Sequence, residues 1–287
     1  MEYTCVSQKG GRLSSVLRQE MGLSTGLMNR LKWRSALLVN GEAVRTDYPV
    51  APGDTVTVVM EEEAPAYPAE DVPLTILYED DFLLAVDKPQ GMLIHPSSAR
   101  NTGTLANAVA GYCLRRGTPG AFHPLTRLDR DTFGVVLIAK NSFACARLQR
   151  THPKKTYHAL TFGAPEEDGG VIDAPIARKE LPSLLREIRP DGKPSVTEYR
   201  VLCRGEKTAR LALNPVTGRT HQLRLHCAYR GFPIVGDPQY GTPAAVAMGS
   251  AMGVQGQQLC ARQIGFPHPV TGEYLVITSR MDVPDPV

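Results

Sequence analysis

The chain has 287 residues, of which 42% are hydrophobic, and its formal net charge is +3. This length accommodates one large or two unequal domains with a sizeable apolar core. The longest apolar runs, such as residues 135–139 (VVLIA), are far too short to cross a bilayer, and the first twelve residues lack the apolar stretch of a signal peptide. The six cysteines form no C-x-x-C pair, which favours reduced thiols. We therefore expect a cytoplasmic protein that does not enter a membrane.

The charges are unevenly distributed along the chain. Residues 1–50 carry +3, residues 51–81 carry −9 with no Lys or Arg, and residues 82–287 carry +9. Two basic regions on either side of an acidic one suit contact with a polyanion, because nucleic-acid affinity comes largely from neutralising phosphates. An ordinary solvated surface would give the same pattern, so the charge alone does not decide between the two interpretations.

Residues 1–60 are predicted to form a small separate domain. Segments 12–21 and 24–33 have helical apolar spacing, residues 37–44 carry an Asn-Gly hairpin signal, and residues 55–59 (TVTVV) alternate like a strand. The second helix is basic, and its candidate RNA contacts are Arg30, Lys32 and Arg34. This order of elements resembles the αL RNA-binding motif of a ribosomal protein and several RNA enzymes. The alternative is a generic α+β cap with a basic surface.

An acidic, proline-rich linker, residues 61–73, is expected to separate this unit from a larger one, residues 74–287. The larger unit alternates long strand-like runs with few helices, which argues for an α+β fold with a mixed, largely antiparallel sheet. The strands are expected at 74–80, 82–89, 134–141, 156–163, 195–204 and 208–215, and helices at 104–116 and after Asn141. The chain contains no glycine-rich nucleotide-binding string, so we expect no nucleotide cofactor.

Two strings carry the chemistry. Residues 127–134 (RLDRDTFG) place a carboxylate between arginines just before an apolar strand, and residues 218–226 (GRTHQLRLH) supply further arginines on a helix-like stretch. A carboxylate at the mouth of an apolar strand is costly unless it is paired or acts on something. A charged loop and an unrelated amphipathic helix would be the plain alternative. The spacing of His221, His226 and Cys227 fits no standard zinc pattern, so we expect no metal.

These strings resemble the RLDRDTSG and GRTHQIRVH signatures of the RluA-type pseudouridine synthases, which convert uridine in RNA to pseudouridine. Four more blocks match that family in the same order, namely 86–96 (VDKPQGMLIHP), 154–160 (KKTYHAL), 192–202 (GKPSVTEYRVL) and 236–241 (GDPQYG). The resemblance covers residues 74–283. It implies the pseudouridine synthase fold, a cofactor-independent isomerase and an RNA substrate, ribosomal or transfer.

The resemblance also assigns roles to individual residues. Asp129 would be the nucleophile. Arg224 would be its cationic partner, and the planar guanidinium of Arg224 could bind the carboxylate through two bonds. Asp131 is the rival nucleophile, although a turn residue that bonds the backbone is its alternative role. Tyr157 would pack on the flipped base and assist removal of the carbon-5 proton. The expected RNA contacts in this domain are Arg127, which would fill the place of the flipped base, Lys88 at the floor of the site, and Arg219, which on a helix would face away from Arg224.

Three residues depart from the family pattern. Thr126 and Cys260 stand where the family has His, and Phe133 stands where it usually has Ser. Each lies beside the expected site, so the departures bear on substrate detail. The leading hypothesis is a monomeric pseudouridine synthase. The alternatives are an inactive RNA-binding protein on the same scaffold, and an RNA hydrolase or methyltransferase, for which the chain shows no metal-carboxylate cluster or cofactor loop.

Overall fold

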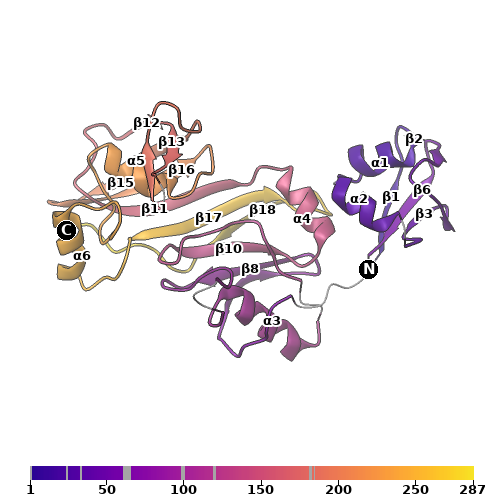
Figure 1. Ribbon diagram of the computed structural model, residues 1–287, viewed down its shortest axis with the longest axis horizontal. Helices are drawn as coiled ribbons and strands as arrows, with labels where there is room; N and C mark the ends of the chain where they lie inside the picture. The colour runs from indigo at the N-terminus through magenta and orange to yellow at the C-terminus, as the bar shows by residue number, and fades with distance from the viewer. Residues whose placement is uncertain are drawn as a thin grey trace.

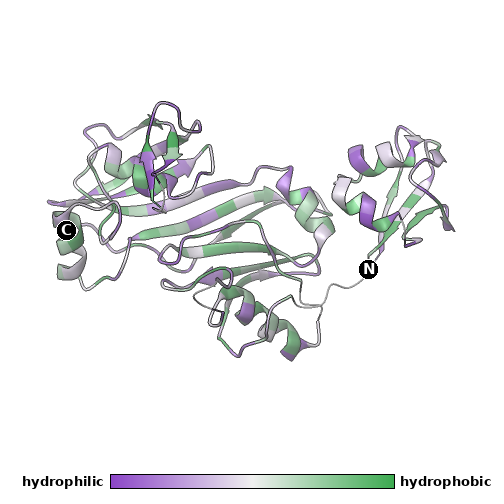
Figure 2. Cartoon of the chain, in the orientation of Figure 1, coloured by the Kyte–Doolittle hydropathy of each residue, from purple (hydrophilic) through white to green (hydrophobic). Residues whose placement is uncertain are grey.

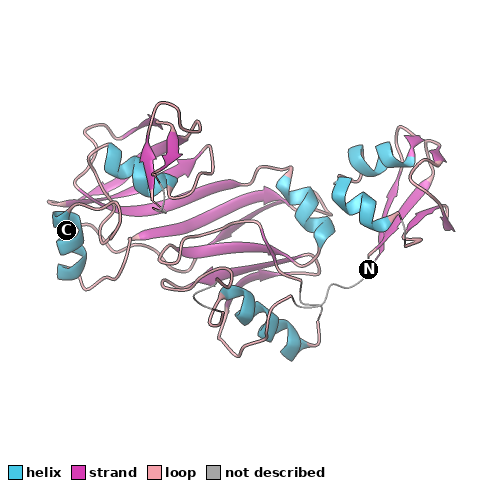
Figure 3. Ribbon diagram, viewed as in Figure 1, coloured by secondary structure: helices cyan, strands magenta, loops and turns pink. Residues whose placement is uncertain are grey.

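The computed structural model describes residues 2–23, 25–32, 34–60, 66–97, 101–118, 121–180, 183 and 185–287. A small unit of strands and two helices lies at one end of the molecule, and a long curved sheet with helices on both sides forms the rest (Figures 1 and 3). No helix in the described ranges is long and apolar enough to cross a bilayer.

The small unit, which we call the N-terminal module, is a four-stranded sheet in the order β1-β6-β3-β4 with two helices on it. Its elements are β1 (Glu2–Val6), β2 (Gly11–Arg12), α1 (Leu13–Gln19), α2 (Thr25–Leu31), β3 (Leu37–Val39), β4 (Glu42–Ala43), β5 (Pro49–Val50) and β6 (Thr55–Val59). Asn40 and Gly41 both have positive φ, as the hairpin turn requires. The predicted helix-helix-hairpin order is confirmed, although Ser24 and Trp33 of the predicted second helix lie outside the described residues.

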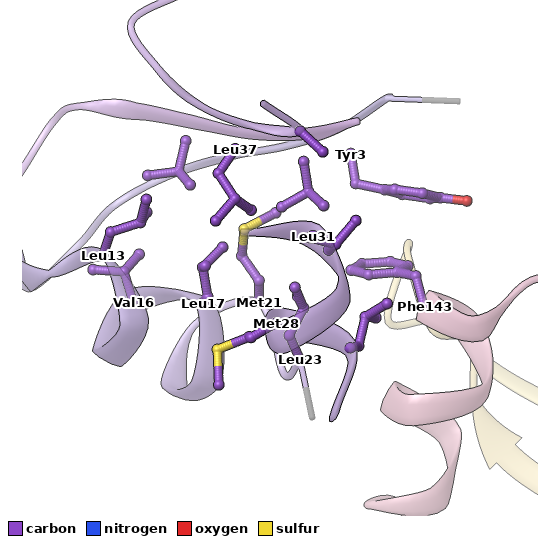
Figure 4. Close-up of a cluster of buried hydrophobic side chains, with 14 of the residues drawn as sticks. Tyr3, Leu13, Val16, Leu17, Met21, Leu23, Met28, Leu31, Leu37 and Phe143 are labelled. Carbon is purple, nitrogen blue, oxygen red and sulfur yellow. The ribbon is translucent and has the colours of Figure 1, made fainter. Parts of the chain in front are cut away.

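Aromatic contacts join the module to the larger unit, and one of them is between Tyr3 and Phe82, with ring centroids 5.8 Å apart. Tyr3 of β1 stacks on Phe143, with ring centroids 4.1 Å apart, and Phe143 is buried within the apolar cluster of the module (Figure 4). The Arg150 guanidinium also donates to the Arg18 carbonyl at the end of α1. Of the linker that we expected between the units, residues 61–65 lie outside the described residues. The domain boundaries stay a prediction.

The large sheet has ten strands and runs β12-β15-β16-β11-β17-β10-β8-β7, with β18 paired to β17 and β9 to β10. Among the described strands, only β10 and β17 pair in parallel, which confirms the expected largely antiparallel α+β sheet. The elements are β7 (Thr75–Glu79), β8 (Leu83–Lys88), α3 (Leu105–Arg116), β9 (His123–Pro124), β10 (Phe133–Ala139), α4 (Ser142–Gln149), β11 (Lys154–Phe162), β12 (Gly169–Asp173), β13 (Ile176–Arg178), β14 (Arg186–Ile188), β15 (Val196–Arg204), β16 (Thr208–Pro215), α5 (Gln222–Tyr229), α6 (Pro243–Ala251), β17 (Leu259–Pro267) and β18 (Tyr274–Thr278).

The central strand β10 is apolar along its length and buried on both faces (Figure 2). Val136 and Ile138 point into the cluster that α3 covers, whereas Val135 and Leu137 pack with β17 and α4, as the alternation of a strand requires. Thr104 caps α3 and Asn141 caps α4 through their side chains. The segment that precedes β10 is therefore held over the centre of the sheet.

The charged string at residues 127–134 ends in Gly134, at a position where only a glycine fits. Its φ is +106°, and a Cβ built there would lie 2.4 Å from the Ala261 carbonyl oxygen of the parallel neighbour β17. Only a residue without a side chain lets the two strands approach this closely. The glycine thus fixes the register between β10 and β17 next to the charged string.

We expect Gly134→Ala to lower the free energy of unfolding by about 2–4 kcal/mol, because it adds an unfavourable backbone conformation to a clash with a neighbouring backbone. Gly163→Ala is the matched control. Gly163 also has a positive φ but has open space at its Cβ, so the backbone term alone should cost about 1 kcal/mol. Urea unfolding measures both, and equal losses would show that the approach of β17 does not require the glycine.

Candidate active site

Asp129 lies in the segment between β9 and β10, which is anchored on both sides. The Thr126 hydroxyl, which is buried, accepts a hydrogen bond from the Leu137 amide of β10, and Leu128 is buried in the core. The Thr132 amide donates to the Asp129 carbonyl and closes a turn. Asp129 is thereby presented above the sheet with its side chain 30% exposed. Thr126 has a structural role here, which accounts for one departure from the family pattern.

Arg224 of α5 meets Asp129, but through a single bond. Its Nη1 donates to Asp129 Oδ2 at 3.0 Å. The two parallel bonds go instead to Asp237, from Nε to Oδ2 and from Nη2 to Oδ1, each at 2.7 Å. The expected pairing of Arg224 with Asp129 is thus present, whereas the expectation that Asp129 is the two-bond partner is wrong.

Asp237 is the residue that the sequence interpretation missed. It is fully buried, and its Oδ1 also accepts from the Gln239 and Tyr240 amides, so the loop 236–241 folds around its carboxylate. The only signal was the GDPQYG string, which carried no role. Burial disfavours the charged guanidinium of Arg224, but the bonds to Asp237 and the charges of Asp237 and Asp129 outweigh that effect and raise its pKa.

Asp131 lies on the same segment as Asp129, and Lys88 bonds that segment through the Arg130 carbonyl. Both carboxylate oxygens of Asp131 accept from the Arg130 guanidinium, at 3.0 and 2.8 Å, so it pairs with a side chain rather than with the backbone as expected. Lys88 has no exposed surface, and its Nζ donates to the Pro89, Met92 and Arg130 carbonyls. Burial lowers the pKa of Lys88 to about 7, although Asp131 and Asp129 counteract part of the shift.

These contacts correct the RNA-binding role that the sequence suggested for Lys88. An ammonium group with its three hydrogens donated to carbonyls inside the protein cannot reach a phosphate. Lys88 instead ties the segment that carries Asp129, through the Arg130 carbonyl, to the loop after β8, through the Pro89 and Met92 carbonyls. The carboxylate of Asp131 is likewise already engaged by a neighbouring guanidinium. Of the two aspartates, Asp129 is the one whose Oδ1 accepts no hydrogen bond from a described residue.

Tyr157 lies on β11, where the pairing with β17 slips by one residue between Thr156 and Tyr157. Its half-buried ring packs between the clusters beneath α3 and α5, and its hydroxyl bonds no described residue. Burial, and then the negative charge of Asp129, raise the pKa of Tyr157, which keeps the phenol protonated near neutral pH. The parallel pairing of β10 with β17 brings the two other departures together, since Phe133 and Cys260 are register partners within one apolar cluster.

The remaining predicted RNA contacts are spread over the molecule. Arg127 is exposed and bonds no described side chain, and Arg30 and Arg34 lie exposed at the end of α2 with Lys32 half-buried between them. Arg219 is not on a helix as expected, because α5 begins at Gln222. Its Nε donates to the Pro194 carbonyl, so part of the guanidinium is bonded within the protein.

His221, which the sequence raised only as a possible metal ligand, stands beside the nucleophile candidate. Its Nε2 lies 3.8 Å from Asp129 Oδ1, and its Nδ1 is 2.8 Å from the Tyr240 hydroxyl. By contrast, both ring nitrogens of His226 are used by Thr197 and the Ala174 carbonyl inside the core. Of the three residues considered for a metal, only His221 faces the site.

Taken together, the geometry offers one partly exposed carboxylate, held by one arginine nitrogen and free at its other oxygen, next to a protonated phenol. A carboxylate of this kind can act as a nucleophile, because the guanidinium holds one oxygen while a lone pair of the other remains available. The exposed Arg127 lies two residues away on the same segment.

Comparisons with known proteins identify the family. Residues 82–229 match the family model of RNA pseudouridylate synthases. An uncharacterized RNA pseudouridine synthase of Bacillus subtilis is 40% identical over 247 residues, which cover 83% of this chain and 80% of that protein. The ribosomal large subunit pseudouridine synthase D of Vibrio vulnificus is 36% identical, covering 77% of this chain and 71% of its own.

The solved structures agree. The human protein RNA pseudouridylate synthase domain containing 1 is 26% identical and superposes with a TM-score of 0.59, over 76% of this chain and 86% of its own. The matched segment contains the strand β10, the helix α5 and the carboxylate–arginine pair between them. The chain therefore belongs to the RNA pseudouridylate synthase family and is an RNA pseudouridine synthase, an isomerase that acts on RNA.

Proposed function

We propose that the chain converts a uridine of large-subunit ribosomal RNA to pseudouridine, with Asp129 as the nucleophile. Ribosomal RNA is favoured over transfer RNA because several relatives at 32–36% identity are ribosomal large subunit pseudouridine synthases. The observation that carries the choice of nucleophile is the Asp129 carboxylate, held at Oδ2 by Arg224 and free of hydrogen bonds to described residues at Oδ1. Asp131 lacks such an oxygen, because Arg130 occupies both.

The reaction must break the bond from ribose to the base nitrogen, turn the base and form a bond at carbon 5. The uridine must first leave the RNA stack, which costs a few kcal/mol. Arg127, exposed next to the nucleophile segment, would take the vacated position. Tyr157, half-buried, would pack on the flipped base, and because its raised pKa keeps the phenol protonated it would act there as a hydrogen-bond donor and not as the base that removes the carbon-5 proton. Neither role needs a resident cofactor.

The N-terminal module would add RNA affinity outside the site. Its exposed Arg30 and Arg34 lie on the last turn of α2 and just beyond it, where they can reach phosphates. Arg219, whose side chain is also exposed, would contribute in the same way. We expect the protein to act as a monomer. All six cysteines are unpaired, which suits the cytoplasm as its place of action.

The inactive RNA-binding alternative gives no reason for the arrangement around Asp129. A protein that only binds RNA gains nothing from a partly exposed carboxylate facing a polyanion, because like charges repel. The bonds from Arg224 and the neighbouring Tyr157 instead suit chemistry at a base.

The test is pseudouridine mapping across total RNA in a strain that lacks the gene. We expect at least one pseudouridine of large-subunit ribosomal RNA to disappear and to return with the wild-type gene. Complementation with Asp129→Asn should restore less than about 1% of the modification, since an amide is a far poorer nucleophile than a carboxylate.

Asp131→Asn is the matched control and should restore most of the modification. A larger loss with Asp131→Asn than with Asp129→Asn would reverse the assignment. Loss confined to transfer RNA would contradict the proposed substrate but not the nucleophile.

Arg224→Lys should be impaired although it keeps the positive charge. A lysine cannot bond Asp237 through two parallel hydrogens and also reach Asp129. We expect kcat for tritium release from carbon 5 to fall by about 100-fold, and the free energy of unfolding by about 2–3 kcal/mol because Asp237 loses partners inside the protein. Arg130→Lys, which alters the exposed pair with Asp131, is the control and should change the unfolding energy by less than about 1 kcal/mol.

Removal of residues 1–60 should weaken RNA binding and its salt dependence while preserving chemistry on a saturating RNA. Phe143→Ser should accompany the truncation, because Phe143 otherwise loses its cover from Tyr3. With Arg30, Lys32 and Arg34 gone, the slope of log affinity against log salt should fall by up to about two or three. The full chain carrying Gln at these three positions should reproduce the change. An unaltered slope in both proteins would mean that the module contacts no phosphate.

A further inference from the structure

His221 joins Asp129 to a chain of hydrogen bonds that comes from outside the catalytic strings. The Arg186 amide of β14 donates to the Tyr240 hydroxyl at 2.9 Å, and that hydroxyl lies 2.8 Å from His221 Nδ1. On the other side of the ring, His221 Nε2 lies 3.8 Å from Asp129 Oδ1. Oδ1 is the oxygen that Arg224 leaves without a bond.

The chain of bonds favours one position for the proton of the imidazole. A phenol has one hydrogen, and the Tyr240 oxygen already accepts one from the Arg186 amide. The hydrogen of Tyr240 finds an acceptor in His221 Nδ1, and no other acceptor for it lies among the described residues. Nδ1 is then unprotonated, so the neutral ring carries its hydrogen on Nε2, which faces Asp129.

The backbone of His221 also points to a function for its side chain. It has φ +57° and ψ +18°, a left-handed conformation, directly before the first residue of α5. Glycine adopts this conformation without strain, whereas a residue with a Cβ does so at a cost. The imidazole is only 15% exposed and lies edge-on to the Tyr240 ring. Strain of this kind persists where the side chain is needed.

We propose that His221 is a positioning residue for the nucleophile, a neutral imidazole whose Nε2–H orients the free oxygen of Asp129. This inference rests on the proposed role of Asp129. The present 3.8 Å exceeds a hydrogen bond, and catalytic bonds commonly tighten only when substrate is bound. Arg224 would then hold one carboxylate oxygen and His221 the other, so the carboxylate could not rotate about its own axis.

The surroundings favour the neutral ring. Burial lowers the pKa of His221, and the neighbouring positive charges of Arg224 on α5 and Arg186 on β14 act in the same direction. The carboxylates of Asp129 and of Asp237 in the loop 236–241 oppose them, and Tyr240 of that loop stays protonated because burial raises its pKa. The His221 pKa remains below its ordinary value, so the ring is neutral at neutral pH. Below that pKa the ring would become charged and form an ion pair with Asp129, which weakens the nucleophile.

The first measurement needs no RNA. Nitrogen-15 NMR of the full-length protein reports the protonation of both ring nitrogens of His221, with His221→Gln used to assign the signal. We expect a neutral ring with hydrogen on Nε2 at pH 7, and a mixture of tautomers in Tyr240→Phe. A hydrogen on Nδ1, or a charged ring at pH 7, would overturn the inference whether or not the protein modifies RNA.

The second measurement is kinetic, with tritium release from RNA of the deletion strain. His221→Gly removes the imidazole without straining the backbone, and we expect its kcat to fall by about 10- to 100-fold with KM within about twofold. His221→Gln keeps an N–H near the position of Nε2 but cannot become charged. The log kcat of His221→Gln should regain at least about a third of the decrease seen in His221→Gly. Its kcat should also stay constant down to a lower pH than that of the wild type.

Tyr240→Phe tests the same point with the imidazole in place. It should lower kcat in the wild type and have no further effect in His221→Gly, because the hydroxyl acts only through the ring. Additive losses, a kcat of His221→Gly within twofold of the wild type, or a Gln variant no better than Gly would each reject His221 as a positioning residue. Absence of turnover in the wild-type protein would instead reject the proposed function and leave the NMR result to decide the tautomer.

Discussion

The buried pair of Arg224 and Asp237 is the interaction on which the site depends. Arg224 is 4% exposed and Asp237 1%, so neither charge is solvated, and each must be satisfied by the other. Two parallel hydrogen bonds join the guanidinium to the Asp237 carboxylate, and two backbone amides donate to the same carboxylate. These bonds fix the guanidinium, which donates a further hydrogen bond from Nη1 to Asp129 Oδ2. The pair holds an arginine rigid at low dielectric, where a single further bond can orient a nucleophile.

The segment that carries Asp129 is held from below by contacts that look unremarkable in the sequence. Lys88 joins three carbonyls with one buried ammonium, and Gly134 lets β10 approach β17 so closely that no side chain fits. These contacts explain why charged residues are tolerated at the start of the most buried strand.

The N-terminal module is connected to the synthase domain by more than a tether. Phe143 is contributed by α4, yet it is buried in the apolar cluster of the module and covered by Tyr3 (Figure 4). Together with the Tyr3–Phe82 contact and the bond from Arg150 to the Arg18 carbonyl, this packing forms the interface between the two units. It gives the module a preferred position at the end of the long sheet while its basic helix end stays exposed.

The sequence by itself determined the local elements and the family. Hairpin signals, caps and alternation are properties of neighbouring residues, and so the helix after Asn141, the strands 208–215 and 55–59 and the Asn40-Gly41 turn are where the patterns indicate. The ordered strings also determined that Asp129 and Arg224 meet, because the family resemblance supplied that long-range contact. Local sequence patterns do not determine which residue pairs with each charged side chain. Asp237, His221 and Tyr240 are brought together by the fold. Lys88 is buried against three carbonyls from two segments that are distant in the sequence, and Phe133 and Cys260 become neighbours only through a parallel pairing. Those pairings follow from burial and from distances in space, which the tertiary structure alone decides.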